Sequence, residues 1–432
     1  MKNPTPSTKM PAPMSVSLKA EKSKTYSNIS LDNALVSCGM SEADKNLTAI
    51  LFYGVTEKKI ALDYIISKLS SRDIDKIDLE ALVAVRMGIY QLKYMDRIPA
   101  HAAINESVSL CPKKLSGFAN AILREYTRRN EIPLPDKSDF AYYLSVKYSV
   151  CKEIADKFIE VFGKEKSEDI LSGFNDKVST TICTNTLKIS RDGLMDKLSA
   201  AKTENAPLGL YVTGSVREMF GFDDGLFFVQ DQASQICVQA LGACEGETVM
   251  DICSCPGSKS FGAAITMNNK GKIYSFDLHE NKLSLIRSGA ERLGINIIEA
   301  SAADGRNFIE KFENTADRVL CDVPCSGFGV LAKKPELRFK DPQLSARLPQ
   351  IQFDILSNAS RYVKSGGTLV YSTCTILPTE NEDVIKRFLE TNSDFSLSDW
   401  SVGNIHAADG MITLYPNIHH TDGFFIAKLI RK

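Results

Sequence analysis

Two cysteines stand just beyond the ends of two predicted strands, where a side chain can take part in chemistry. Cys374 follows the apolar run 368–371, and Cys325 follows the run 318–322. Parallel strands end at the same edge of an open sheet, so adjacent strands would bring both thiols to one crevice. A thiolate there is a nucleophile. The alternative for Cys374 is a buried cysteine that packs as a small apolar side chain, which is commoner.

Carboxylates occupy similar positions after other predicted strands. Asp277 ends the second strand, Asp304 follows the third and Asp322 ends the fourth. An acid after the second strand suits a ribose diol, and Asp304 can accept a hydrogen bond from an adenine amine. Each aspartate alone is as easily a cap or turn residue. Three of them, together with a glycine-containing first loop, favour a ligand site.

The loop after the first strand is the candidate cofactor loop. Its residues are Cys253, Ser254, Cys255, Pro256, Gly257, Ser258 and Lys259. Pro256 and Gly257 predict a sharp turn, and the following helix would offer free N–H groups to an anionic group. The loop lacks the GxGxxG pattern, which disfavours an NAD-dependent dehydrogenase. S-adenosyl-L-methionine fits better, because it has a carboxylate, a ribose diol and an adenine but no phosphate, and its sulfonium sits well among carboxylates.

The elements that must position these residues belong to an α/β domain at 231–432. Strand signals alternate with helical stretches, which predicts a doubly wound parallel sheet. The five strand signals are 248–252, 272–277, 297–300, 318–322 and 368–371, and a late run at 423–429 is an added strand. Asp231 or Ser234 is expected to cap the first helix of this domain.

The rest of the chain divides into three parts. Residues 27–130 predict an all-α bundle, in which Leu82, Val85, Ile89 and Leu92 share one helix face. Residues 131–230 predict linker helices and a small α/β module with short strands at 180–184, 210–212 and 226–229. Residues 1–26 are rich in proline, serine and lysine and predict a disordered lead-in with no signal peptide.

Composition excludes several classes of protein. The chain of 432 residues has a net charge of -1, so any nucleic acid must meet local basic patches. No apolar run is long enough to cross a bilayer. The 11 cysteines contain no CxxC pair, which argues against a disulfide framework and against a metal site. We expect a cytoplasmic protein, with a monomer as the favoured state.

Two clusters of basic residues are either solvated faces or phosphate contacts. The first cluster lies at the end of the bundle and the second follows Cys325. They comprise Lys113, Lys114, Arg124, Arg128 and Arg129, and Lys333, Lys334, Arg338 and Lys340.

The bundle resembles the NusB-type RNA-binding domain. The similarity is carried by the segments 46–55, 90–99, 102–106 and 117–124. In that family the domain is a helical bundle that binds RNA or docks partners. The resemblance therefore favours RNA as the partner of the first basic cluster.

The segment 176–432 resembles the RNA 5-methylcytosine methyltransferases of the NOL1/NOP2/Sun family. Its motifs are 253–259, 322–327, 372–381 and 420–425. The sequence departs from the family at Ser258, where glycine is usual, and at Cys183, where an Arg-x-Asn motif is usual. Together the two resemblances imply a bacterial 16S rRNA methyltransferase with a Rossmann-like domain that uses S-adenosyl-L-methionine.

The resemblance also implies a role for each catalytic candidate. Cys374 attacks C6 of a cytosine that is single-stranded or flipped, and C5 then accepts the methyl group. Asp322 hydrogen-bonds the base near N3, and Cys325 assists proton removal from C5 and product release. Cys325 is the rival nucleophile, because a Pro-Cys after the fourth strand has that role in DNA cytosine-C5 methyltransferases. A second hypothesis is an RNA-binding ribosome-assembly factor with a vestigial methyltransferase site, which the two departures support.

Overall fold

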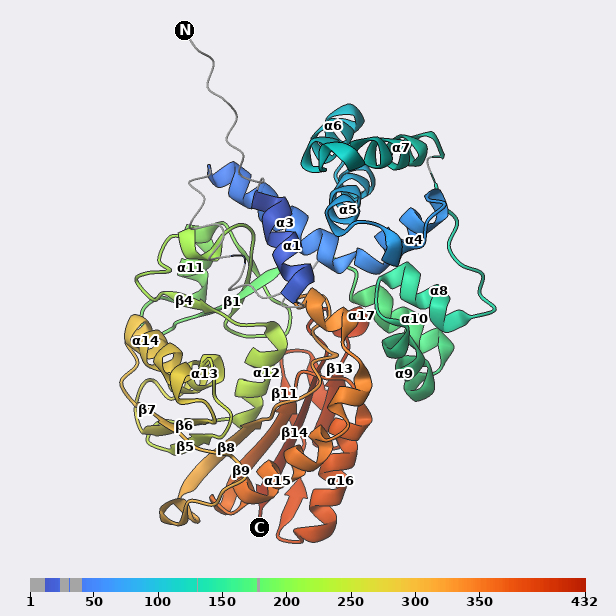
Figure 1. The fold of residues 1–432 in the computed structure, drawn as a ribbon. Coiled ribbons are helices and arrows are strands. Elements are labelled where there is room, and N and C mark those ends of the chain that lie inside the picture. The colour runs from blue at the N-terminus through green and yellow to red at the C-terminus, as the bar shows by residue number, and fades with distance from the viewer. Residues whose placement is uncertain (1–11, 24–30, 32–40, 130, 177–178) are drawn as a thin grey trace. The chain divides into compact units, whose positions relative to one another are not determined.

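The computed structural model describes residues 12–23, 31, 41–129, 131–176 and 179–432 (Figure 1). These residues form two compact units. The helical unit contains the described residues up to Ser172 and a separate segment, Lys333–Pro342. The sheet unit contains the described residues of Gly173–Ala332 and Gln343–Lys432.

The helical unit is built around α5, which runs from Leu79 to Tyr94. The predicted apolar residues Leu82, Val85 and Ile89 are buried, but so are most of the residues between them. The helix is therefore central rather than amphipathic. The elements of the unit besides α5 are α1 (Ala12–Ser23), α3 (Glu42–Glu57), α4 (Lys59–Leu69), η1 (Ile74–Lys76), α6 (Ala100–Leu110), α7 (Lys113–Arg129), α8 (Phe140–Tyr148), α9 (Lys152–Phe162), α10 (Lys164–Gly173) and η5 (Pro335–Phe339). Of these, helices α1, α3, α4, α6 and α7 contact α5.

Helix α1 corrects the predicted boundary of the lead-in. Residues 12–23 fall within the segment that composition assigned to disorder, yet they form a helix that buries Met14 and Leu18 in the core of the helical unit. Residues 1–11 and 24–26 lie outside the described residues. Glu21 of α1 bonds Arg86 at 3.1 Å, and Arg86 also bonds both carboxylate oxygens of Asp63 at 2.6 and 2.8 Å. A buried ion network thus joins α1, α4 and α5.

The small module is a four-stranded antiparallel sheet in the order β2-β3-β1-β4. Its elements are β1 (Thr180–Thr184), α11 (Arg191–Leu198), β2 (Ala201–Lys202), β3 (Gly209–Val212), η2 (Val216–Glu218) and β4 (Phe227–Val229). The predicted strands are present. Asn185 is buried after β1, and its side-chain amide donates to the carbonyls of Gly225 and Leu293 at 2.8 and 2.9 Å.

The large sheet has the path β10-β14-β9-β8-β5-β6-β7, with β13 paired to β14. All pairs from β9 to β7 are parallel, whereas β14 is antiparallel to β9. This is the doubly wound α/β fold that the sequence predicts, with the late strand added at one side. The strands are β5 (Thr248–Asp251), β6 (Lys272–Asp277), β7 (Ile298–Ala302), β8 (Ala316–Asp322), β9 (Val363–Thr373), β10 (Phe395–Leu397), β13 (Met411–Leu414) and β14 (Phe424–Arg431), and a separate hairpin is formed by β11 (Trp400–Val402) and β12 (Ile405–Ala407).

Helices cover both faces of this sheet, because successive strand residues point to opposite sides. Val249 packs in a core with α12, α13 and α14, whereas Met250 packs in a second core with α15 and α16. The helices are α12 (Gln232–Leu241), α13 (Ser258–Thr266), η3 (Glu280–Lys282), α14 (Leu283–Leu293), η4 (Glu310–Phe312), η6 (Pro342–Ser345), α15 (Leu348–Ser360), η7 (Pro378–Glu380), α16 (Glu382–Thr391) and α17 (Pro416–His419). Asp231 caps α12 through the Ala233 N–H.

Strand β9 starts earlier than the sequence indicates. Two glycines at 366–367 suggested a strand that begins at Thr368, but the strand begins at Val363. Gly366 has a φ of 76°, and the pairing with β8 changes register between Ala316 and Arg318. The glycines therefore form an irregularity within the strand.

In the part of the chain that the structure describes, no helix has the length and apolar character needed to span a membrane.

Candidate active site

The site residues gather where the strand order of the large sheet reverses. The chain passes from β5 outward to β6 and β7, and then returns to β8 on the other side of β5. In open α/β sheets a ligand lies beyond the strand ends at such a point. Asp251 ends β5, Asp277 ends β6, Asp322 ends β8 and Thr373 ends β9, so the predicted loops begin at this edge.

The cofactor loop is tied to the end of β6. The backbone N–H and the hydroxyl of Ser254 both donate to the Phe276 carbonyl, at 2.8 and 3.0 Å. The Cys255 N–H donates to Asp277 Oδ2 at 3.2 Å. Burial raises the pKa of the Cys253 thiol, so this residue is a neutral packing group. The loop therefore contributes positioned backbone groups to the site, and the Cys253 thiol is not a reactive group.

The turn predicted at Pro256 and Gly257 is present. Gly257 has a φ of 107°, and a Cβ there would approach the Phe261 ring to 2.6 Å, so glycine is required. Ser258 is the first residue of α13, and its φ is not among the positive values of the chain. The departure from the family at Ser258 therefore places a side chain where the helix tolerates one.

Lys259 connects the cofactor loop to the predicted catalytic aspartate. Its ammonium lies 2.6 Å from Asp322 Oδ2, and the Ser372 hydroxyl donates to Asp322 Oδ1 at 2.9 Å. Burial lowers the pKa of Lys259, but the charge and hydrogen bond of Asp322, together with the neighbouring Cys237 and Asp251, outweigh this effect and leave the pKa above its ordinary value. Lys259 is thus a charged partner of Asp322, and Ser372 is a contact that sequence reasoning did not assign.

The two candidate thiols meet, as the adjacent strands predict. Cys325 Sγ and Cys374 Sγ are 2.9 Å apart, and neither cysteine forms a disulfide. The Cys374 N–H also points at Cys325 Sγ, at 3.2 Å. The hydrogen bond with Cys374 and burial raise the pKa of Cys325 well above its ordinary value. Cys325 is therefore held as a neutral thiol.

The two outer aspartates differ in their surroundings. Asp277 accepts the N–H groups of Cys255 and His279, one on each oxygen, and its side chain is partly exposed. Asp304 is instead bound by Arg306 on both oxygens, at 2.6 and 2.9 Å, and this hydrogen bonding lowers its pKa. Asp277 keeps free lone pairs for a diol, whereas an adenine amine would share Asp304 with Arg306.

Asp251 was not among the predicted site residues. It is 1% exposed, and its Oδ2 accepts the Ser260 hydroxyl at 2.7 Å. Burial raises its pKa to about 7. Its position at the end of the first strand was visible in the sequence, but its burial depends on the packing of α13.

The structure corrects the second basic cluster. Arg338 was a candidate phosphate contact, but its side chain is fully buried in the helical unit. It donates to the Tyr148 carbonyl at 2.7 Å and lies 3.7 Å from Glu57. A buried guanidinium with these partners is a structural element and does not bind a backbone phosphate.

The first basic cluster lies on α7, and its members are exposed. Arg128 and Arg129 both pair with Glu125 of the same helix. Arg124 donates to the Asn120 side chain at 3.0 Å. Among the described residues, no carboxylate pairs with Lys113, Lys114 or Arg124 of this cluster, whereas Arg128 and Arg129 share Glu125.

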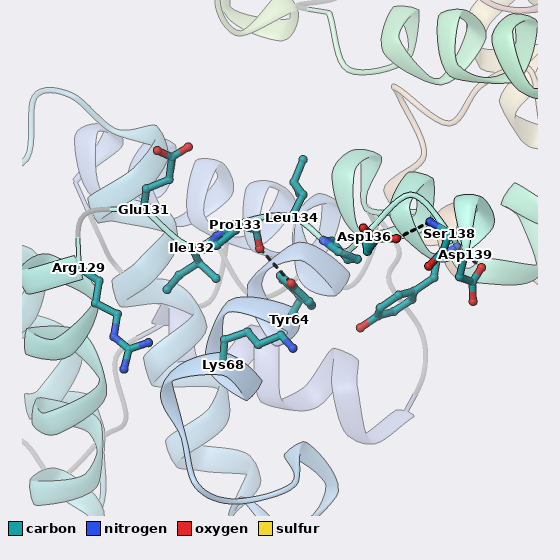
Figure 2. Close-up of a pocket in the computed structure, with 12 residues that line it drawn as sticks. Tyr64, Lys68, Arg129, Glu131, Ile132, Pro133, Leu134, Asp136, Ser138 and Asp139 are labelled. Atoms are coloured by element: carbon teal, nitrogen blue, oxygen red, sulfur yellow. Dashed lines mark hydrogen bonds between the residues drawn. The ribbon is translucent and has the colours of Figure 1, made fainter.

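A groove of about 820 Å³ lies beside the end of α7 (Figure 2). The Tyr64 hydroxyl donates to the Pro133 carbonyl at 2.9 Å and so fixes the segment that borders the groove. Lys68 and Arg129 are its cations, but three carboxylates line it as well, from Glu131, Asp136 and Asp139. The mixture of charges does not favour an anionic ligand.

No group of histidine, cysteine and acidic residues suited to a metal ion occurs among the described residues.

The fold and site define an α/β enzyme class whose ligand lies beyond the parallel strand ends. Comparison with known proteins narrows the class. Residues 12–128 match the NusB family, and residues 238–430 match the family described as 16S rRNA methyltransferase RsmB/F. The probable ribosomal RNA small subunit methyltransferase B of Bacillus subtilis is 34% identical over 96% of this chain and 97% of its own length. The ribosomal RNA small subunit methyltransferase B of Escherichia coli is 30% identical over 91% of this chain and 92% of its own length.

The chain therefore belongs to the ribosomal RNA small subunit methyltransferase B family. Two solved structures from Pyrococcus horikoshii share the fold. A methyltransferase homologue has a TM-score of 0.59 and 28% identity, and covers 67% of this chain and 98% of its own. NSun6, solved with SFG, has a TM-score of 0.59 and 22% identity, and covers 65% of this chain and 98% of its own.

Proposed function

We propose that this protein transfers a methyl group from S-adenosyl-L-methionine to C5 of a cytosine in 16S rRNA. The observation that carries the proposal is the meeting of Cys325 and Cys374 beside the Asp322–Lys259 pair, in a chain of this family. A thiol pair and a carboxylate at one strand edge suit covalent activation of a base. The substrate places the activity in the cytoplasm.

The cofactor side of the site fits S-adenosyl-L-methionine by the chemistry of its donors. Asp277 has acceptor capacity for a ribose diol, and the first turn of α13 has free N–H groups for a carboxylate. Asp304 would contribute on the adenine side. When bound, S-adenosyl-L-methionine supplies the methyl group. The family resemblance and the anionic strand edge support this choice over a phosphorylated cofactor.

The reaction requires that a poor carbon nucleophile be activated. The Cys374 thiolate forms a bond to C6 of cytosine, and the electron pair of the C5=C6 bond becomes available at C5. Asp322, which is fixed by Lys259 and Ser372, would accept a hydrogen bond from N3 of the base when N3 is protonated, so that thiolate attack gives a neutral adduct rather than an anion. After methyl transfer a water molecule takes the C5 proton, the C5–H electron pair reforms the C5=C6 bond, and the sulfur–C6 bond breaks to release the Cys374 thiolate beside the Cys325 thiol.

The surroundings of Cys325 support its assignment as the helper. Its raised pKa keeps it protonated, so it suits donation of a hydrogen bond to the departing Cys374 thiolate better than attack. Its Sγ also accepts the Cys374 N–H and so lies against the proposed nucleophile. Cys374 is therefore the nucleophile in this proposal.

Methyl transfer to 16S rRNA tests the function directly. Labelled S-adenosyl-L-methionine and rRNA from cells that lack the gene should give 5-methylcytosine, identified by nuclease digestion and mass spectrometry. Cys374→Ala should abolish transfer and leave no protein–RNA adduct after denaturation. An adduct that persists in Cys374→Ala would assign attack to Cys325, and a different methylated base would reject the proposed chemistry.

The second hypothesis is an RNA-binding assembly factor without catalysis. Cys183 supports it, because this residue is buried in β1 where the family usually has a charged side chain. Isothermal titration with S-adenosyl-L-methionine separates the two hypotheses. Saturable binding supports the enzyme, and its absence supports the assembly factor.

A further inference from the structure

A buried pair of side chains clamps the backbone on both sides of Cys325. The Gln352 amide donates to the Pro324 carbonyl at 3.0 Å, and Glu380 Oε2 accepts the Ser326 N–H at 2.9 Å. The same Gln352 amide donates to Glu380 Oε2 at 2.9 Å, so the two side chains act as one bracket. Neither residue touches the thiol itself in these contacts.

The bracket is anchored to the element that carries the other cysteine. The Tyr371 hydroxyl, from β9, donates to the Glu380 carbonyl at 2.6 Å. The Ser326 hydroxyl donates to Thr375 Oγ1, one residue after Cys374, at 2.8 Å. The position of the Cys325 loop relative to Cys374 is therefore fixed by polar contacts rather than by apolar packing alone.

A carboxylate is a costly choice for this position. Glu380 is 2% exposed and Gln352 is 0% exposed, and Oε1 of each has no hydrogen-bond partner in the structure. A buried ion pays several kcal/mol in desolvation, whereas an apolar side chain of similar size would often stabilise the fold. The cost indicates that Glu380 serves the site.

The charge of Glu380 also acts on the neighbouring thiol. The pKa of Cys325 is raised first by its hydrogen bond with Cys374, then by burial, and the negative charges of Glu380 and Asp322 add to the effect. A negative charge near a thiol disfavours its thiolate. Glu380 thus influences both the place and the protonation of Cys325.

We propose that Glu380 is a positioning residue that, with Gln352, holds the Cys325 thiol against Cys374. The assignment of Cys325 as the helper rests on the proposed function. The geometry of the bracket does not, so it can be tested without RNA or cofactor.

Two substitutions separate charge from position. Glu380→Gln keeps an oxygen for the Ser326 N–H and the Gln352 amide but removes the negative charge. Glu380→Met removes both. The matched control is Glu382→Gln, two residues further on, whose carboxylate accepts the Thr413 hydroxyl.

The first measurement is the rate of Cys325 alkylation by iodoacetamide in the full chain, followed by peptide mass spectrometry from pH 6 to 10. Glu380→Gln should shift the pH profile of Cys325 to lower pH, because the thiolate is no longer opposed by that charge. The control should keep the wild-type profile. A Cys325 profile that is the same in wild type, Glu380→Gln and Glu380→Met overturns the proposal, even if activity falls.

The second measurement is methyl transfer with separate kcat and KM values. We expect kcat to fall roughly tenfold in Glu380→Gln and roughly a hundredfold in Glu380→Met, with KM for S-adenosyl-L-methionine within about twofold. Equal losses in Glu380→Met and in the control overturn the positioning role. If the wild-type chain shows no methyl transfer, the proposed function fails while the alkylation profile still decides the role of Glu380.

Discussion

At the residue scale, Asp251 is a carboxyl group whose surroundings strongly oppose its ionisation. It is buried at the end of β5, and its Oδ1 has no hydrogen-bond partner in the structure. Its Oδ2 accepts the Ser260 hydroxyl, which lies 2.8 Å from the Ser275 hydroxyl. Burial and the charge of Asp322 raise the pKa, and Ser260 only partly offsets them. The folded protein therefore binds this proton more tightly than the unfolded chain does.

Asp251 should make the sheet unit less stable as pH rises. The pKa goes from 3.8 in the unfolded chain to about 7 in the folded protein, so the free energy of unfolding falls as pH increases between these values. Asp251→Asn removes this dependence and should raise stability at pH 7.5 by about 1–3 kcal/mol. Urea unfolding followed by fluorescence of Trp400, the single tryptophan of the chain, measures it in the sheet unit.

Asp317 gives a control of opposite sign. Burial raises its pKa, but Lys364 and the Thr248 N–H outweigh burial, so the folded pKa lies below 3.8. Its ionised form stabilises the fold above that value, and Asp317→Asn should lower stability at pH 7.5. For Asp251 the contradicting outcome is a wild type that is more stable than Asp251→Asn at pH 7.5. That result would show that ionisation of Asp251 does not lower the free energy of unfolding.

At the element scale, the cofactor loop needs glycine at position 257, whereas α13 accepts either serine or glycine at its first residue, position 258. Gly257→Ala forces a left-handed φ on alanine and drives its Cβ into the Phe261 ring. We expect a loss of about 1–3 kcal/mol in stability or in S-adenosyl-L-methionine binding. Ser258→Gly should change binding less than threefold, because Ser258 already has a helical backbone. Calorimetric titration of both variants checks this, and tighter binding by Ser258→Gly would contradict it.

Helix α7 gives a second prediction at this scale. Alanine at Lys113, Lys114 and Arg124 together should weaken binding to a 16S rRNA fragment. It should also reduce the slope of log K against log salt by about 2–3, because fewer counterions are released. Alanine at Arg128 and Arg129 should reduce it less, since both cations pair with Glu125. Fluorescence anisotropy at several salt concentrations measures the slopes, and equal slopes for wild type and the triple variant would remove α7 from the RNA interface.

Elements with a strong local pattern were predictable from the sequence. The parallel strands of the large sheet end where their apolar runs meet polar residues, and adjacency of β8 and β9 placed Cys325 and Cys374 together. Contacts set by distant residues were not predictable. The Lys259–Asp322 pair joins residues 63 positions apart, and α1 is helical because the core of the helical unit buries its apolar side.

At the scale of the whole molecule, the helical unit is built from two separate parts of the chain. Lys333–Pro342 leaves the sheet unit soon after Cys325 and belongs to the helical unit. Within that unit the Arg338 carbonyl accepts the Cys151 N–H at 2.7 Å, and Lys59 lies over the Phe339 ring. The local sequence there is basic and contains proline, a pattern that fits either a solvated loop or a phosphate contact. Only the packing of α3, α8 and α9 shows that it is structural.

Arg338→Met should therefore destabilise the helical unit. The substitution leaves the Tyr148 carbonyl without its donor and removes the more distant of two cations beside Glu57, since the Lys58 ammonium remains 2.6 Å from that carboxylate. The loss of the buried hydrogen bond should cost about 1–3 kcal/mol. Hydrogen exchange should accelerate at amides of α8 and α9. Lys334→Ala is the matched control, because Lys334 is exposed in the same segment. Equal exchange in the two variants would show that Arg338 is dispensable, whereas faster exchange only in Arg338→Met establishes that a segment adjoining the Cys325 loop helps to hold the helical unit together.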